Sequence, residues 1–246
     1  MVRYSPALRG LGVPHTFTTR SSWAGVELGP QLIAELGASP GSPIVSLTQV
    51  HGAEVQRVTA AGVTPETCGD ALTADFPGPV LLIRTADCVP VLASSLDGRR
   101  VAALHAGWRG IVAGVVPAAL EALGAGAFDA AVGPCLSTAH FEVGHEVAEA
   151  FREAGLGDAV CFPGGAGDSG GSGGPDGPRG PGGARPHVDL RLAVRLQLER
   201  AGARRIDVSR SCTWDDAELF SYRRDVTHGG HAVTGRLGAL IAVRAT

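Results

Sequence analysis

Three apolar runs follow one another in PVLLIRTADCVPVLASSLDGRRVAALHA, residues 79–106. The runs 79–86, 89–95 and 99–106 are rich in apolar or β-branched residues, and each has the length of a strand. Asp97 and Gly98 form a strong turn signal between the second and third runs. The stretch therefore predicts successive strands, of which the last two form an antiparallel hairpin.

Working outward, similar apolar runs predict strands at 44–49, 53–60, 127–133, 204–210 and 232–244. Apolar residues at helical spacing predict helices at 111–123, 140–154 and 190–201. Asp189 stands directly before the last helix as a candidate N-cap. Strands occur in consecutive pairs as well as alternating with helices, which favours the α+β class with mixed sheets over a doubly wound parallel sheet.

A chain of 246 residues is long enough for a substantial core, and we expect one domain over 1–246. One segment differs from the rest: residues 163–186 contain 11 glycines in 24 positions. Such a composition buries almost nothing, so the sequence predicts a flexible, disordered Gly/Pro-rich insertion without a function of its own.

The charge pattern excludes several classes of protein. All 21 basic residues are arginines, and the formal net charge is −3. The balance gives no basic footprint for nucleic acid, and the lack of lysine excludes a P-loop or a Schiff base. No apolar run approaches the roughly 18 residues of a membrane span, and no signal peptide is recognisable, so we expect a cytoplasmic protein with no membrane partner.

Three short segments combine a histidine or cysteine with a strand end. They are TQVHG (48–52), TADCVP (85–90) and ALHAGWRG (103–110). His51, Cys88 and His105 would make a reasonable three-ligand zinc set that leaves a fourth position for water or substrate. The separations along the chain do not decide the matter. Cys88 could instead be a nucleophile with a histidine base oriented by Asp87, or all three residues could be core or surface residues.

Arginine is the only anion clamp available. Arg20 closes the run HTFTTR (15–20), whose alternating residues could line a strand. Arg109 follows Trp108 at the start of a helix, where backbone N–H groups also favour anions. A surface ion pair for each arginine and a core position for Trp108 remain open alternatives.

Ten segments together resemble a known family. They are HTFTTR (15–20), LTQVHGAEV (47–55), GDALTADFPG (69–78), TADCVPVL (85–92), AALHAGWRG (102–110), AVGPCLSTAHFEVG (131–144), HVDL (187–190), SCTW (211–214), FSYRRD (220–225) and TGR (234–236). The sequence resembles the laccase-domain or polyphenol-oxidase-like (YfiH-like) family, whose members are regarded as purine nucleoside phosphorylases with adenosine deaminase activity. ADCVPVL followed by HAGWRG is the most specific part of the match.

The resemblance implies a layered α+β fold with two mixed sheets between helices, an α/β/β/α-like arrangement. It implies Zn²⁺, with copper possible, held by His51, Cys88 and His105. One departure from the family follows Arg20, where an Asn-containing region is missing; this chain contains no Asn. Substrate contacts made by that region in the family are therefore in doubt here.

The expected function is phosphorolysis of adenosine, inosine, guanosine or methylthioadenosine, with deamination of adenosine. We expect Arg20 and Asp87 to act in catalysis. Gln49, Trp108 and Arg109 are expected to contact the substrate. The partners would be a purine nucleoside and phosphate, for a monomer or homodimer. The alternatives are a copper-dependent polyphenol oxidase, a non-catalytic nucleoside- or metal-binding protein, and a cysteine hydrolase.

Overall fold

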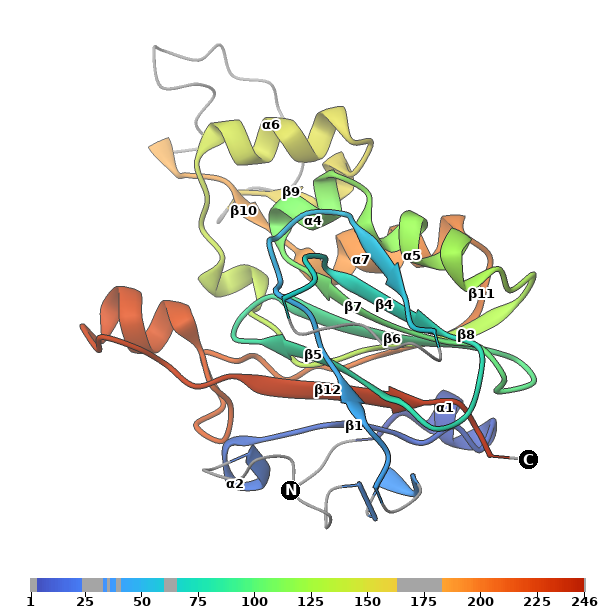
Figure 1. The fold of residues 1–246 in the computed structure, drawn as a ribbon. Helices are drawn as coiled ribbons and strands as arrows, with labels where there is room; N and C mark the ends of the chain where they lie inside the picture. Colours follow the sequence, from blue (N-terminus) through green and yellow to red (C-terminus); the bar gives the residue numbers. More distant parts are fainter. Residues whose placement is uncertain are drawn as a thin grey trace.

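Two mixed β-sheets stack face to face in the computed structural model (Figure 1). The structure describes residues 4–23, 33–34, 36–38, 41–59, 66–162 and 183–245. The larger sheet has the strand order β11-β8-β6-β7-β4-β3, and the smaller has the order β1-β12-β5-β2. A separate antiparallel pair joins β9 (Val160–Cys161) to β10 (His187–Val188).

The centre of the larger sheet is the hairpin that Asp97 and Gly98 predicted. It consists of β6 (Val89–Ser95) and β7 (Val101–Ala106), which pair antiparallel. The other strands of this sheet are β3 (Val55–Arg57), β4 (Ala71–Ala74), β8 (Phe128–Val132) and β11 (Ala203–Val208). The two outer pairs, β3 with β4 and β8 with β11, are parallel, which makes the sheet mixed.

The smaller sheet joins segments from both ends of the described chain. Its strands are β1 (His15–Phe17), β2 (Ile44–Val45), β5 (Val80–Thr85) and β12 (Leu237–Ala242). The strand β12 lies between β1 and β5 and pairs antiparallel with both.

Strict alternation of apolar side chains gives both sheets their two faces. Leu92, Ala103 and Ile83 point into the core between the sheets. Their neighbours along the strands, such as Val91 and Leu104, point into the core beneath the helices. Because both faces of these strands are buried, their sequences read as continuous apolar runs.

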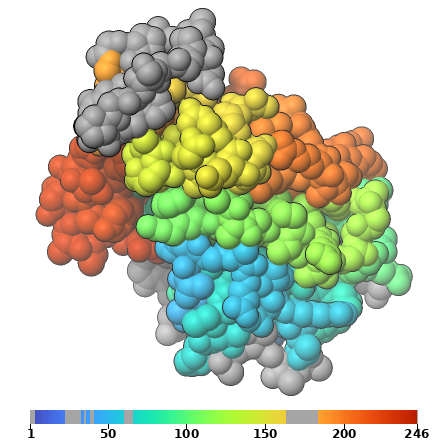
Figure 2. Space-filling model, turned by 90° about the horizontal axis from the view of Figure 1, so that it is seen from above, coloured from blue at the N-terminus to red at the C-terminus, as the bar shows by residue number. Residues whose placement is uncertain are grey.

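Helices cover the outer face of the larger sheet. They are α4 (Trp108–Val112), α5 (Val115–Leu123) and α7 (Leu190–Arg200), with α6 (His145–Glu153) beside them. Figure 2 shows this face from above, with α5 in green, α6 in yellow and α7 in orange. Leu36, in a short helical stretch, covers the outer face of the smaller sheet. The prediction of an α+β fold with mixed sheets flanked by helices is therefore confirmed.

Several element boundaries differ from the sequence-based expectation. The predicted helix 111–123 is divided at Gly114, which adopts a left-handed conformation with φ of 85° between α4 and α5. The predicted helix 140–154 begins only at 145, because residues 138–140 form the 3₁₀ turn η1 (Thr138–His140). Asp189 does cap α7, accepting a hydrogen bond from the Leu192 N–H. The short strand β4 and the helices α1 (Pro6–Gly10) and α2 (Arg20–Trp23) were not predicted.

The predicted insertion 163–186 falls mainly on residues 163–182, which lie outside the described residues. Its flanks are described, since β9 and β10 pair on either side of it. The extent of a single domain over 1–246 stays a prediction. Within the described part of the chain, no helix combines the length and the apolar character that crossing a bilayer demands.

Candidate functional site

The site lies where the chain crosses from one sheet to the other. After β5 ends at Thr85, the turn Ala86–Cys88 leads directly into β6 of the larger sheet. Asp87 in this turn has a φ of 91°, which is unusual for a residue with a side chain. Pro90 lies opposite His105 in the hairpin, so Cys88 and His105 share the face of neighbouring strands that looks toward the smaller sheet.

His51 reaches the same place from a loop that Asp70 holds. The Asp70 carboxylate accepts hydrogen bonds from the N–H groups of Val50, His51 and Gly52, at 3.2, 3.0 and 2.7 Å. His51 itself has a φ of 60°, a left-handed conformation that these bonds maintain. The loop is thus fixed to the residue immediately before β4.

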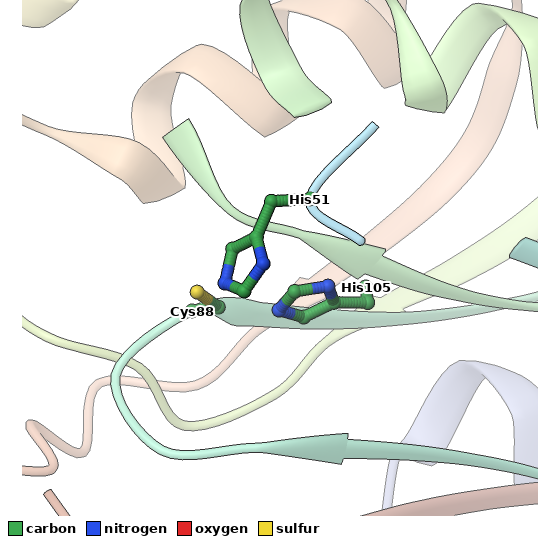
Figure 3. Close-up of side chains that lie close together, drawn as sticks. All are labelled: His51, Cys88 and His105. Atoms are coloured by element: carbon green, nitrogen blue, oxygen red, sulfur yellow. The ribbon is translucent and has the colours of Figure 1, made fainter. Parts of the chain in front are cut away.

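The side chains of His51, Cys88 and His105 converge (Figure 3). One donor atom from each lies within 4.8 Å of the other two, and the two imidazole rings meet edge to face at 4.7 Å. The lack of a side chain at Gly107 makes room for them, because a Cβ there would lie 3.0 Å from His51 Cδ2 and 3.2 Å from Cys88 Sγ. The structure therefore brings together the three residues that the sequence singled out.

Asp70 also determines the charge state of the triad. It is fully buried, and its Oδ1 lies 2.7 Å from His105 Nδ1. Desolvation favours the neutral imidazole, but the hydrogen bond to Asp70 and the contact with Cys88 raise the pKa of His105 to about 9. Desolvation likewise opposes ionisation of Cys88, yet its contacts with His105 and His51 lower the pKa of the thiol to about 7. Without a bound cation, the triad is thus close to a thiolate–imidazolium pair.

This donor set fits a zinc ion. Two imidazole nitrogens and one sulfur, the latter already easily ionised, are ligands that Zn²⁺ accepts, and they would leave one of four positions open. Because Nδ1 of His105 is engaged by Asp70, Nε2 is the nitrogen left for a metal, the arrangement that holds many metal-binding histidines in place. Copper also binds such donors.

A pocket of about 990 Å³ opens over the triad. Four arginines line it: Arg84, Arg109, Arg223 and Arg236. Aromatic side chains line it as well, including Trp108, Phe141 and Tyr222. The Tyr222 side chain stands out because it is half exposed although large and apolar. A concave site with cationic groups, aromatic rings and a metal-type triad suits a small anionic or aromatic ligand.

Four further predicted site residues line this pocket. The Gln49 side-chain amide forms two hydrogen bonds with the backbone of Arg84, at 2.8 and 2.9 Å. These bonds connect the loop that carries His51 to β5. Arg109 stacks over the Trp108 ring at 4.5 Å and has an exposed side chain. Asp87 accepts hydrogen bonds from the Thr213 hydroxyl and the Arg223 N–H, both at 2.6 Å.

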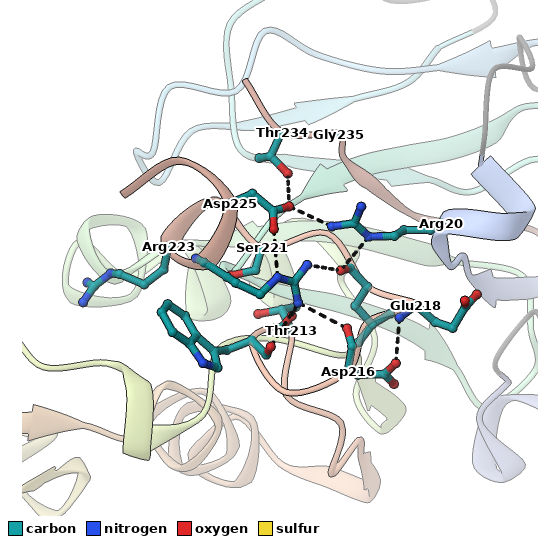
Figure 4. A network of polar contacts seen from close by, with 12 residues as sticks. Arg20, Thr213, Asp216, Glu218, Ser221, Arg223, Asp225, Thr234 and Gly235 are labelled. Carbon is teal, nitrogen blue, oxygen red and sulfur yellow. Dashed lines mark hydrogen bonds and ion pairs between the residues drawn. The ribbon is translucent and has the colours of Figure 1, made fainter. Parts of the chain in front are cut away.

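Arg20 is placed differently (Figure 4). Its guanidinium donates to Asp225 at 2.8 Å and to the Leu219 carbonyl at 3.0 Å, and it lies over the Phe220 ring. It does not belong to the described residues that line the pocket. Asp225 in turn accepts from Thr234, which does line the pocket. A role for Arg20 as an anion clamp stays a prediction.

Asp70 and Tyr222 were missed by sequence reasoning. A signal for Asp70 was present, because it stands directly before the apolar residues Ala71 and Leu72, and a charged residue inside a buried run needs a partner. Asp87 was considered as the residue that orients a histidine, but the carboxylate that contacts His105 belongs to Asp70. Nothing in the sequence indicated which residue of FSYRRD would face the pocket.

Comparisons with known proteins find relatives over most of the chain. The family model described as multi-copper polyphenol oxidoreductase laccase matches residues 26–244. A Deinococcus radiodurans protein named purine nucleoside phosphorylase is 36% identical over 263 residues, which cover 97% of this chain and 93% of that protein. An Escherichia coli K12 protein named purine nucleoside phosphorylase YfiH is 32% identical over 219 residues, covering 88% and 80%.

Solved structures show the same fold. A crystal structure of a Neisseria meningitidis protein superposes with a TM-score of 0.76 at 27% identity, over 100% of this chain and 99% of that one. The crystal structure of YlmD from Geobacillus stearothermophilus gives a TM-score of 0.75 at 26% identity, over 98% and 94%.

Proposed function

This chain belongs to the multi-copper polyphenol oxidoreductase laccase family, and from that premise we propose that it is a zinc-dependent purine nucleoside phosphorylase that also deaminates adenosine. The observation that carries the proposal is the pocket itself, in which the triad of His51, Cys88 and His105 lies beside four arginines and an exposed aromatic ring. The names of the curated relatives support the same substrate class.

In phosphorolysis, a phosphate oxygen bonds to ribose C1′ while the bond from C1′ to the purine nitrogen breaks, and the purine takes up a proton. Charge builds on both partners, so fixed cations are the main requirement. Arg109 and Arg84 have exposed side chains at the pocket and would hold phosphate. One face of Trp108 is covered by Arg109, which leaves the Tyr222 ring to stack on the purine.

Asp87 contributes from the pocket wall. Its two carboxylate oxygens each accept one hydrogen bond, from Thr213 and from the Arg223 N–H, so lone pairs remain for a ribose hydroxyl. Gln49 would position this wall of the pocket through its two hydrogen bonds to the backbone of Arg84. Arg20 would act through Asp225 and Thr234 by holding the far wall in place.

A zinc ion held by the triad would supply Lewis-acid activation of a water molecule, the chemistry that deamination of adenosine requires. His51 favours this proposal over a cysteine hydrolase. A Cys88–His105–Asp70 nucleophile would need only two of the converging side chains, whereas a metal uses His51 as the third. Asp70 would keep the His105 ring oriented in either case.

The test is to incubate the zinc-loaded protein with adenosine or inosine, with and without phosphate. We expect purine base and ribose 1-phosphate only with phosphate, and inosine from adenosine in both conditions. Cys88→Ser should lose both reactions, whereas Cys161→Ser, which changes an exposed thiol outside the pocket, should keep them. If the fully zinc-loaded protein forms neither the purine base nor inosine, the proposal is refuted.

The family description also names a polyphenol oxidase. Oxygen consumption with a phenol after stoichiometric copper loading measures that activity directly. Copper-dependent turnover of the phenol, together with no reaction of nucleosides, would replace the proposed function by this one.

A further inference from the structure

A second cluster of metal-type donors lies outside the pocket. The donor atoms of His140, Cys212 and Asp215 all lie within 4.8 Å of one another. None of the three lines the pocket over the first triad. We propose that His140, Cys212 and Asp215 bind a second divalent ion of the zinc class, with a fourth position open to solvent.

The donors suit such an ion. A thiolate, an imidazole and a carboxylate are all common zinc ligands, and a sulfur donor disfavours Mg²⁺ and Ca²⁺. His140 Nε2 lies 2.8 Å from Asp215 Oδ1, so the two need only a small separation to admit an ion. The Asp215 side chain is 61% exposed, which gives both an entry path and room for water as a fourth ligand.

The sulfur of Cys212 is buried and already has a backbone partner. Its residue is only 6% exposed, and the Ser137 N–H donates to its sulfur at 3.4 Å. Hydrogen-bond partners of this kind orient the ligand side chains in metal sites. A plain hydrogen bond between His140 and Asp215 would need no such sulfur beside it.

The cluster is held in place by contacts of its own. The His140 ring stacks on Trp214, with ring centres 4.9 Å apart and planes 16° apart. The Arg224 guanidinium donates to the Trp214 carbonyl at 3.0 Å, and the Asp216 N–H donates to the Cys212 carbonyl at 3.0 Å. Donors that are already oriented lose little freedom when an ion binds.

The consequence is mechanical. An ion there would join η1 to the loop 212–215. The carbonyl of His140 accepts from Arg223, whose side chain lines the pocket. The second site would therefore stiffen one wall of the first pocket without taking part in its chemistry.

The experiment is a titration of metal-free Cys88→Ser protein with Co²⁺, a spectroscopic substitute for zinc. Because the first site then has no sulfur, any thiolate-to-cobalt charge-transfer band must come from another cysteine. We expect one equivalent with such a band, its loss in Cys88→Ser/Cys212→Ser, and its retention in the matched control Cys88→Ser/Cys161→Ser. Asp215→Asn and His140→Gln, made in the same background, should each weaken Co²⁺ binding at least about tenfold.

If replacing the buried Cys212 impairs folding, the variants Asp215→Asn and His140→Gln still test the proposal. The proposal is overturned if folded Cys88→Ser protein shows no charge-transfer band with Co²⁺. It is also overturned if a band appears but the Co²⁺ affinity is unchanged by Asp215→Asn and His140→Gln. Since the readout is cobalt binding to sulfur in a protein whose first site has no sulfur ligand, it does not depend on whether the proposed nucleoside activity is correct.

Discussion

At the scale of single residues, one buried carboxylate organises the site. Asp70 receives three backbone N–H groups of the His51 loop and the imidazole of His105. Two of the three candidate metal ligands thus depend on one fully buried side chain that is not among the described residues lining the pocket. Burial opposes its ionisation, but the hydrogen bond to His105 and the backbone donors hold the pKa of Asp70 below its ordinary value.

Asp70→Asn should weaken zinc binding by about 10- to 100-fold, the usual effect of losing the partner of a metal-binding histidine. In the native protein the donors share the two carboxylate oxygens of Asp70. The amide of the variant has only one acceptor oxygen for the same donors, and its NH₂ group would face an N–H group. Zinc affinity measured by competition with a chelating dye checks this. Asp75→Asn, which removes an exposed carboxylate paired with Arg57, is the control and should bind zinc normally.

Gly107→Ala tests the space between the ligands. The added methyl group would lie 3.0 Å from His51 Cδ2 and 3.2 Å from Cys88 Sγ, so the ligands must move apart. We expect at least about a tenfold loss of zinc affinity with little change in folding. Gly126→Ala, where a Cβ meets nothing within 4 Å, is the control. Unchanged affinity in Gly107→Ala would show that the ion does not sit among these three side chains.

At the scale of elements, continuous apolar runs and turn chemistry made the central hairpin predictable, and helical spacing of apolar residues made α7 predictable. Val89–Ser95 and Val101–Ala106 carry their own strand and turn signals. The boundaries failed where local conformation overrode the apolar pattern, as at Gly114, which ends α4 by taking a left-handed conformation. Short elements such as β4 were missed because four residues carry too little periodicity to register.

One network joins two helical elements and the loop before β12 at the C-terminal side of the pocket. Asp225, in the π-helical segment η4 (Arg223–His228), binds Arg20 of α2 and Thr234 (Figure 4). It also accepts a hydrogen bond from the neighbouring Arg224. Burial opposes ionisation of this carboxyl, but the hydrogen bonds from Thr234 and Arg224 and the nearby arginines lower the pKa of Asp225 to about 2.

Asp225→Asn should therefore reduce the free energy of unfolding by about 1–2 kcal/mol at pH 7. A carboxyl with a lowered folded-state pKa contributes stability above its unfolded pKa of about 4, and this contribution is lost as the pH falls through about 2. Denaturant titrations from pH 7 to pH 2 should show the two proteins converging below pH 4. Glu149→Gln, at an exposed ion pair, should cost less than about 0.5 kcal/mol. A difference in the free energy of unfolding between the two proteins that stays constant from pH 7 to pH 2 would contradict this account.

At the scale of the whole molecule, the class of fold followed from the sequence but its topology did not. Paired and helix-flanked apolar runs indicate mixed sheets, yet no local signal assigns β5 and β6, three residues apart, to different sheets. The same limit applies to the candidate metal ligands. His51, Cys88 and His105 were recognisable as candidates, while their convergence depends on that crossing between sheets. The resemblance to a family supplied what spacing did not.

Removing most of residues 163–182 should leave the fold and the proposed nucleoside reactions unchanged. The pairing of β9 with β10 already brings the flanks together, so the segment closes a loop whose cost changes by only about 0.6 kcal/mol per halving of its length. Melting temperature and activity of the shortened protein, compared with the full chain, are the measurements. A lost activity at unchanged stability would assign the segment a role that its composition does not suggest.

The position of β12 between β1 and β5 has a consequence during synthesis on the ribosome. Thr18, just after β1, bonds through its hydroxyl to the N–H of Gly238, a residue 220 positions later. At typical translation speeds the nascent β1 must wait roughly 10 to 45 s for its partner strand to be made. Throughout that interval the backbone edge of β1 lacks the strand that it pairs with in the folded protein. We therefore expect newly made chains to need a chaperone more than the mature protein does.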